Sequence, residues 1–493
     1  MIESLTKQRN GFLFIFLGIF LLPVTIYLFI FTTNLTFNYS LIWILPLFYM
    51  LCLLLVFIIN PNIKYNKAGL LILFLYAIRM VVFPLFLNLN NGYSGYWIGS
   101  NVFLNIDSAV LIQCYEFLIV AVMIGFKKNN SSKTINDIII SQDIKKIKMI
   151  GYIIISMSAV FGSILLYYPS LLGIFRPIVM NTNDFIEWQI NHEQIKRHMP
   201  LMLYHLSTWA VPLLKIILVY YFIIIIKKIM KKELLAFWLS VFLISTLVLI
   251  TTDDKAGGTF AALAMLLLLF KLYPGKRKIG LGFVIIMSII VFIVTFIMMP
   301  FRNSTENFAD FIGYKLNAYF SGSINVAASL TMPRNNLAAY FAGDVLRSIP
   351  LAQGFFTNMP MSYLLFNQSL GYDTVYNSQI LPCVGQSCFY FGYFGAPVFS
   401  VILILFAMRC YFKAKTTSDS FGCFIYYYLT IFLSAGVILY DFFLTLYLIM
   451  QYCLPFYVIY KLFLVKRSDQ RDGNVRGASL HFCGSDSRTG RLI

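Results

Sequence analysis

Long apolar runs follow one another along most of this chain, and they restrict its possible folds more than any other feature. A helix needs about 20 apolar residues to cross the hydrocarbon core of a bilayer. Twelve runs approach that length, at residues 11–31, 41–59, 68–87, 106–126, 148–169, 203–226, 233–250, 257–272, 279–299, 393–412, 421–440 and 442–463. Only 12% of the residues are charged, whereas soluble domains carry about 25%. The sequence therefore predicts an all-α, polytopic membrane protein with about twelve transmembrane helices.

Basic residues gather in alternate connections between these runs. Such residues are Lys64, Lys67, Lys127, Lys128, Lys133, Lys145, Lys146, Lys148, Lys227, Lys228, Lys231, Lys232, Lys271, Lys276, Arg277, Lys278, Arg409, Lys413 and Lys415. Membrane proteins concentrate Lys and Arg in their cytoplasmic loops. We therefore expect these connections and both termini to be cytoplasmic, and we attribute the net charge of +18 to this bias rather than to nucleic-acid binding.

This topology divides the chain into four parts. Residues 1–299 hold helices 1–9 and an outer loop at 170–202, residues 300–392 form one large extracytoplasmic loop, residues 393–463 hold helices 10–12, and residues 464–493 form a disordered cytoplasmic tail. The loop at 300–392 is far longer than an ordinary connection, and such loops are usually functional. Its aromatic and glycine-rich composition predicts a folded cap with short helices.

Several basic residues lie on the predicted outer side, against the general bias. They are Arg176, Lys196, Arg197, Lys255, Arg302, Lys315, Arg334 and Arg347. Guanidinium groups bind phosphate oxygens bidentately, so a ring of such residues suits a diphosphate. The alternative is that they are lipid-headgroup anchors or solvated loop charges.

The stretch "TTDDKAGGTF" at 251–260 places two acids, a lysine and two glycines between apolar runs. We interpret it as an outer turn that presents Lys255 and leads into a helix whose first N–H groups favour anions. An ordinary polar turn also needs Gly and Asp, so that alternative stays open.

Three charges lie inside predicted spans: Arg79, Glu116 and Lys215. Arg79 and Glu116 lie at similar depth in consecutive helices, which favours an ion pair of structural rather than functional importance. The sequence leaves open whether Cys383 and Cys388 form a disulfide. We expect neither a metal nor a cofactor.

Two stretches resemble the Wzy-type repeat-unit polymerases of bacterial O-antigen and capsular polysaccharide synthesis. They are "TTDDKAGGTFAALAMLLLLF" at 251–270 and "NSQILPCVGQSCFYFGYFGAPVFS" at 377–400. Gly385, Gly392 and Gly395 match the family pattern, whereas Gln386 stands where the family often has Glu and Lys255 where it often has Arg. The resemblance also includes the arrangement of about twelve spans and the large outer loop near the C-terminal end of the sequence.

The resemblance implies a multi-pass enzyme of the bacterial cytoplasmic membrane. It would join undecaprenyl-diphosphate-linked oligosaccharide units at the outer face, as a metal-independent glycosyltransferase-type polymerase. A clamp on the leaving diphosphate would use Arg176, Lys255, Arg302, Arg347 and Arg197, and the candidate catalytic bases are Asp344, Asp373 and Glu306. The expected partners are the lipid-linked substrate, the bilayer, a chain-length regulator and a flippase.

Three other functions are alternatives. A flippase for the same lipid-linked unit would show evenly spaced short loops, and an O-antigen ligase typically has a histidine in the large loop, which residues 300–392 lack. A secondary transporter would not need clustered outer basic residues.

Overall fold

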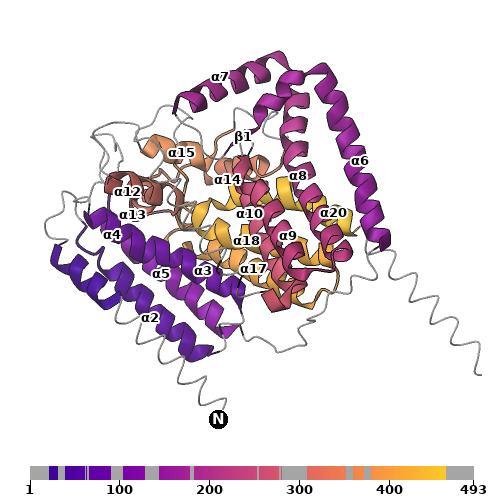
Figure 1. Cartoon of the computed structure of the whole chain (residues 1–493). Helices are drawn as coiled ribbons and strands as arrows, with labels where there is room; N and C mark the ends of the chain where they lie inside the picture. Colours follow the sequence, from indigo (N-terminus) through magenta and orange to yellow (C-terminus); the bar gives the residue numbers. More distant parts are fainter. Residues whose placement is uncertain are drawn as a thin grey trace, which may run out of the picture.

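The computed structural model describes residues 21–31, 39–61, 63, 66–89, 104–127, 144–177, 182–251, 255–276, 279, 282, 308–350, 359–370 and 379–461. This part of the chain is helical apart from one short antiparallel pairing between β1 (Arg176–Pro177) and β2 (Ile250–Thr251). The predicted all-α class is therefore confirmed (Figure 1).

Seven described helices are long and apolar enough to cross a membrane. They are Lys67–Leu89, Ile106–Phe126, Lys148–Tyr167, Trp209–Ile229, Tyr393–Thr416, Ser420–Leu439 and Phe442–Ile459. Four shorter apolar helices cover Leu21–Phe31, Ile44–Ile59, Glu233–Leu249 and Ala256–Leu272. These helices lie where the apolar runs predict them and fit a membrane protein. The predicted span at 279–299 lies almost wholly outside the described residues, so the total of twelve stays a prediction.

The helices of the first half follow the chain in this order: α2 (Ile44–Ile59), α3 (Lys67–Ala77), the π-helix η3 (Ile78–Val82), α4 (Phe83–Leu89), α5 (Ile106–Phe126), α6 (Ile144–Tyr167), the 3-10 helix η5 (Pro169–Ile174), α7 (Thr182–His198), α8 (Leu201–Ile229), α9 (Glu233–Leu249), α10 (Lys255–Leu272) and the 3-10 helix η6 (Pro274–Lys276). The second half holds α12 (Phe308–Tyr319), α13 (Ser323–Leu330), α14 (Leu337–Arg347), α15 (Ser362–Ser369), α16 (Cys383–Phe391), the 3-10 helix η8 (Tyr393–Gly395), α17 (Val398–Thr416), α18 (Ser420–Leu439), α19 (Phe442–Leu448), the π-helix η9 (Ile449–Cys453) and α20 (Leu454–Ile459).

Both π-helical segments end two residues before a proline. Ile78–Val82 precedes Pro84, and Ile449–Cys453 precedes Pro455. Proline has no N–H to donate, and its ring crowds the carbonyl four residues earlier, so the helix widens instead of continuing the α pattern. The apolar runs at 68–87 and 442–463 therefore form helices with a local change of winding, and the first change includes Arg79.

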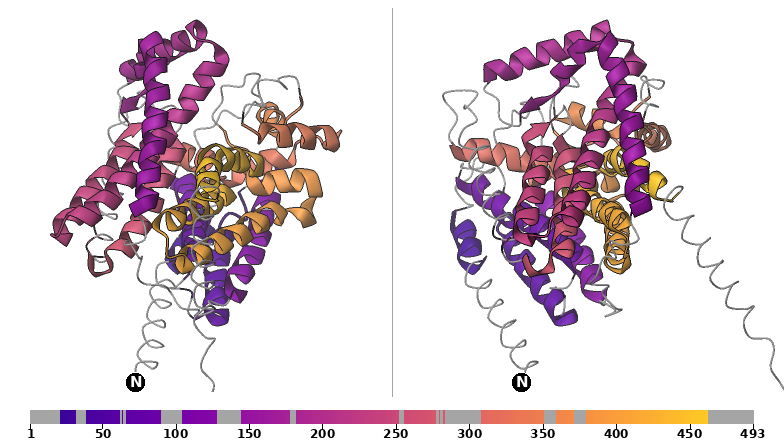
Figure 2. Two further views of the ribbon diagram at one scale, coloured as in Figure 1. Left: turned by 90° about the vertical axis from the view of Figure 1, so that its right-hand side faces the viewer. Right: turned by 45° about the vertical axis from the view of Figure 1, so that its right-hand side comes forward.

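Helix α18 is the centre of the bundle. Every residue from Ser420 to Ile438 is buried except Leu429. Helices α10 and α17 pack on either side of it, and Figure 1 shows α18 between them. The N-terminal helices α2 to α5 form a neighbouring group, whereas α7 joins the ends of α6 and α8 at one extremity in both views of Figure 2.

The two ends of the bundle are each fixed by polar contacts. At one end β1 pairs with β2, joining two segments that the sequence predicts to be extracytoplasmic. At the other end Lys271 Nζ donates to the Thr417 carbonyl at 2.8 Å, joining two segments predicted to be cytoplasmic. These contacts agree with the alternation of the loops, while the side on which each end lies stays a prediction.

In its described residues the segment predicted as a cap contains five short helices, α12 to α16. Two of them are not peripheral, because α13 and α16 are buried along most of their length and pack against α5 and against each other. Gly385 makes this approach possible, since a Cβ there would lie 2.1 Å from Ser329 Oγ. Part of the segment is thus built into the core together with the long apolar helices.

Candidate functional site

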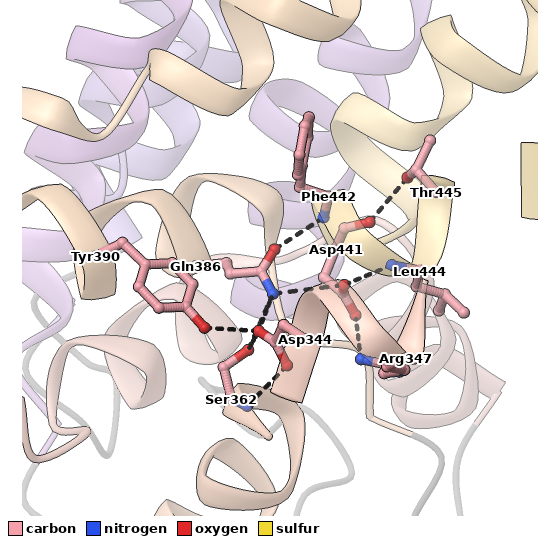
Figure 3. Close-up of polar contacts among 9 residues, drawn as sticks. All are labelled: Asp344, Arg347, Ser362, Gln386, Tyr390, Asp441, Phe442, Leu444 and Thr445. Atoms are coloured by element: carbon pink, nitrogen blue, oxygen red, sulfur yellow. Dashed lines mark hydrogen bonds and ion pairs between the residues drawn. The ribbon is translucent and has the colours of Figure 1, made fainter. Parts of the chain in front are cut away.

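A buried polar network joins α14, α15, α16 and the start of α19. Its members are Asp344, Arg347, Ser362, Gln386, Tyr390 and Asp441, and Figure 3 shows their side chains converging. Asp344 and Arg347 lie one helical turn apart on α14, so they share one face. The outward face of α14 carries the exposed Phe341 and Val345, whereas the polar face turns inward.

Asp344 is surrounded by hydrogen-bond donors. Its Oδ2 accepts from the Tyr390 hydroxyl at 2.7 Å, from Gln386 Nε2 at 3.0 Å and from the Ser362 hydroxyl, while its Oδ1 accepts from the Ser362 backbone N–H at 3.0 Å. These donors are uncharged. Burial raises the pKa of the Asp344 carboxyl above its ordinary value, and the charge of Asp441 raises this pKa further.

Gln386 occupies the middle of the network and links its two acids. Its Nε2 donates to Asp344 Oδ2 at 3.0 Å and reaches Asp441 Oδ1 at 3.5 Å. Its Oε1 accepts from the Phe442 backbone N–H at 2.9 Å. That backbone donor fixes the orientation of the amide, so the NH₂ group must face the two carboxylates. A glutamate could not supply these donors, which explains physically why Gln suits this chain where the resembling family often has Glu.

Asp441 caps α19 and holds Arg347. Asp441 Oδ1 accepts from the Leu444 N–H at 2.8 Å, the geometry of an N-cap. Arg347 Nη1 lies 3.2 Å from Asp441 Oδ2, and the guanidinium carbon lies 4.0 Å from the centre of the Tyr363 ring. The cation is therefore fixed on two sides, by a carboxylate and by an aromatic face.

The structure unites only part of the predicted site. Asp344 and Arg347 lie together, with Gln386 from the glycine-rich stretch. Arg197 is exposed on α7, away from this network. Among the other predicted residues, Asp373, Glu306 and Arg302 lie outside the described residues, and for Arg176 and Lys255 only the backbone is described, in β1 and at the start of α10.

Sequence reasoning did not select three members of the network, Ser362, Tyr390 and Asp441, and among them Asp441 had a recognisable signal. It stands between the apolar runs at 421–440 and 442–463. A lone acid at such a junction is a recognisable signal, both for a helix N-cap and for a partner of a nearby cation.

The glycines of "TTDDKAGG" serve helix packing. A Cβ at Gly257 would lie 2.7 Å from Tyr452 Cε1, and a Cβ at Gly258 would lie 2.7 Å from the Leu247 carbonyl oxygen. Neighbouring protein atoms thus fill the space beside both glycines. These two glycines therefore allow α10 to pack closely against α9 and η9, and the preference of its first N–H groups for an anion stays a prediction.

The predicted pair of intramembrane charges is confirmed. Arg79 Nη1 lies 2.8 Å from Glu116 Oε2, and both side chains are buried. Arg79 Nε and Gln113 Nε2 both donate to the Ser321 carbonyl, at 3.0 and 3.2 Å. Ser321 has a φ of 52°, a left-handed conformation that costs energy in a residue other than glycine. The pair therefore holds the turn that leads into the buried helix α13, which is a structural role.

The contacts of Asp344 fit a positioning role better than the role of a catalytic base. The Asp344 carboxylate accepts four hydrogen bonds within the protein, three of them at Oδ2, so as a catalytic base at that oxygen it would first have to give up one of these contacts. Asp344 instead fixes α14 to α15 and α16.

Cys383 and Cys388, whose pairing the sequence left open, are free buried thiols in α16.

No protein-family model, no curated protein and no solved structure matches this chain.

Proposed function

We propose that this chain polymerises lipid-linked oligosaccharide repeat units at the outer face of a bacterial cytoplasmic membrane. The observation that carries the proposal is the buried network around Arg347. Asp344, selected as a base, accepts a hydrogen bond from Gln386, which belongs to the stretch that resembles the polymerase family. Arg347, selected for the clamp, pairs with Asp441, and Gln386 reaches Asp441 as well. Seven candidate membrane spans support the membrane location.

The proposed reaction transfers a growing glycan to an incoming repeat unit. The bond between the anomeric carbon of the growing chain and its lipid diphosphate breaks, and a hydroxyl of the incoming non-reducing sugar forms the new glycosidic bond. The hydroxyl proton passes to a base, and the lipid diphosphate leaves with its negative charge increased. A preoriented cation stabilises such a leaving group, typically by a factor of about 10²–10³ in rate.

Arg347 is the described residue that fits the cationic role. Asp441 and Tyr363 hold its guanidinium, so little reorganisation would be needed when phosphate charge develops. Asp344 acts as a positioning residue for α14 in this proposal, because its carboxylate already accepts four hydrogen bonds from the protein. Arg302, Lys255, Arg176 and Arg197 remain candidates for the rest of the clamp, and Asp373 and Glu306 remain candidates for the base.

The test is complementation of a deletion strain with single-residue variants at matched membrane levels. We expect Arg347→Ala, Arg302→Ala and Lys255→Ala to insert normally but to yield little long polymer, with single repeats accumulating. Lys255→Arg should remain active because it keeps the charge. Arg409→Ala is the matched control, since Arg409 is an exposed arginine of α17 outside the network.

The product of the deletion itself distinguishes the alternatives. Loss of a polymerase leaves single repeats exposed or lipid-linked outside, whereas loss of a flippase traps them inside. Loss of a ligase leaves long polymer on the lipid carrier. Near-normal polymer length in all three alanine variants would exclude the clamp and leave those residues as headgroup anchors.

A further inference from the structure

A second arginine lies at the opposite end of α14 from Arg347. Arg334 Nε donates to the Phe389 carbonyl of α16 at 3.0 Å, which fixes the plane of the guanidinium. The residue as a whole is exposed. In the described part of the chain no carboxylate forms an ion pair with it, unlike Arg79 and Arg347. Its charge is therefore oriented but not neutralised by a described residue.

The terminal nitrogens of Arg334 lie beside Gly392. A Cβ at this glycine would be 3.5 Å from Arg334 Nη1 and 3.7 Å from Nη2. Gly392 has a φ of 76°, a conformation that side-chain-bearing residues rarely adopt. The turn therefore brings bare backbone against the guanidinium and leaves that side of the cation without a covering side chain.

Exposed aromatic residues surround the same turn. Phe391, Tyr393 and Phe394 are 48%, 63% and 93% exposed. Tyr393 is also the first residue of the candidate membrane span Tyr393–Thr416. Tyrosines at the ends of membrane helices typically lie at the level of the lipid headgroups, whereas phenylalanine rings are apolar throughout. An arginine and an aromatic rim thus meet where a helix enters the bilayer.

Helix α14 extends this apolar surface from Arg334. Its outward face carries Phe341 and Val345, which are 42% and 36% exposed, and Ile349, two residues after the helix, is 42% exposed. The Phe341 ring packs against Tyr390 with ring centroids 5.4 Å apart, so at this point α14 touches α16, the helix that bears Phe391. The cation therefore stands at the head of an apolar strip.

We propose that Arg334 binds the phosphate group of a bilayer phospholipid, with the aromatic rim and the outer face of α14 against its acyl chains. Arginine is suited to phosphate because its planar donors match two phosphate oxygens. A free phosphate would leave the apolar strip uncovered, whereas a lipid satisfies both the charge and the apolar surface. Arg347 lies across an 11-residue helix, roughly 16 Å long, so the lipid site is separate from the proposed clamp. The proposal needs only the membrane location, not polymerase activity.

The test measures lipid binding to the purified, delipidated full-length chain. Phosphatidylglycerol, diacylglycerol with the same acyl chains and inorganic phosphate are compared by native mass spectrometry and by the shift of the unfolding temperature. We expect phosphatidylglycerol to bind more tightly than the other two. Arg334→Gln should weaken it by about tenfold or more, the usual effect of losing a charge-assisted hydrogen bond.

Three variants make the result specific. Arg334→Lys should recover part of the affinity because it keeps the charge, and Phe394→Ala should weaken binding without unfolding the chain because its ring is 93% exposed. Arg409→Gln removes an exposed arginine on a different helix, α17, and should bind phosphatidylglycerol as the wild type does. Equal phosphatidylglycerol binding by wild type and Arg334→Gln would overturn the proposal. Equal stabilisation by diacylglycerol or by inorganic phosphate would overturn it as well.

Discussion

Removal of one partner from the Arg79–Glu116 pair should destabilise the chain severely. The two atoms lie 2.8 Å apart and both side chains are almost inaccessible, at 1% and 0% exposure. Glu116→Leu leaves the Arg79 charge buried without its carboxylate, and Arg79→Leu leaves the Glu116 charge buried without its guanidinium. Either change should cost about 3–5 kcal/mol of unfolding free energy, the usual penalty for an uncompensated buried charge.

The double replacement by leucine should be much milder than the sum of the two losses. It removes both charges together, and the remaining losses include the hydrogen bond from Arg79 Nε to the Ser321 carbonyl and the one from the Ser400 hydroxyl to Glu116 Oε1, each worth about 1 kcal/mol. Gln113 Nε2 still donates to that carbonyl, so the turn before α13 keeps one donor. The two single losses should therefore exceed the double loss by about 3 kcal/mol or more.

The assay is reversible unfolding of the purified chain in mixed micelles of increasing denaturing-detergent content, applied to wild type, both single variants and the double variant. The same order should appear in membrane expression, with the double variant above either single one. Strict additivity of the two losses would refute the pair as a mutually compensating unit. Additivity would mean that each side chain stabilises the fold through its other contacts and not through the ion pair.

Three further predictions concern topology and the buried network. A cysteine introduced at Ser304 should react with an impermeant reagent in intact cells and one at Ser141 should not; the reverse pattern would invert the topology. Gln386→Glu should lower the unfolding temperature and the polymer yield, because a third carboxylate replaces the amide that donates to Asp344 and Asp441; unchanged stability of Gln386→Glu at neutral pH would argue against that arrangement. Because the pKa of Asp344 is raised in the folded chain, the folded state binds more protons there than the unfolded state, so the contribution of Asp344 to stability falls as pH rises above the ordinary aspartate range. Asp344→Asn should remove that part of the pH dependence of the unfolding free energy, and identical pH profiles for the two proteins would contradict the raised pKa.

The local sequence pattern was sufficient to predict the positions of the long helices and one contact between consecutive helices. Runs of apolar residues predicted the positions of the long helices, because a backbone in lipid must satisfy its hydrogen bonds within the segment. The Arg79–Glu116 pair could be predicted for a related reason. The two residues are only 37 positions apart, in consecutive helices at similar depth, so one connection brings them together.

Only the tertiary structure decided the composition of the buried network. Arg347 and Asp441 are 94 residues apart, and Gln386 reaches across 42 residues to Asp344 and 55 to Asp441. No periodicity or spacing encodes such contacts, because they depend on how α14, α16 and α19 pack. The same packing surrounds the Asp344 carboxylate with four hydrogen-bond donors, although its type and place in the sequence equally suited a base.

The burial of α13 and α16 shows most clearly the difference between what the sequence predicts and what the tertiary structure decides. Serines and glycines interrupt the apolar character of "SGSINVAASL" at 321–330, so length and hydropathy assign it to a loop outside the bilayer. In the fold those small side chains permit close approach: a Cβ at Gly322 would lie 2.4 Å from Asn317 Oδ1. The sequence by itself determined which segments are apolar helices. The contacts of Arg79, Gln113 and Ser321 determined which polar segment enters the core, because the hydrogen bonds that make burial of that backbone favourable come from residues distant in the chain.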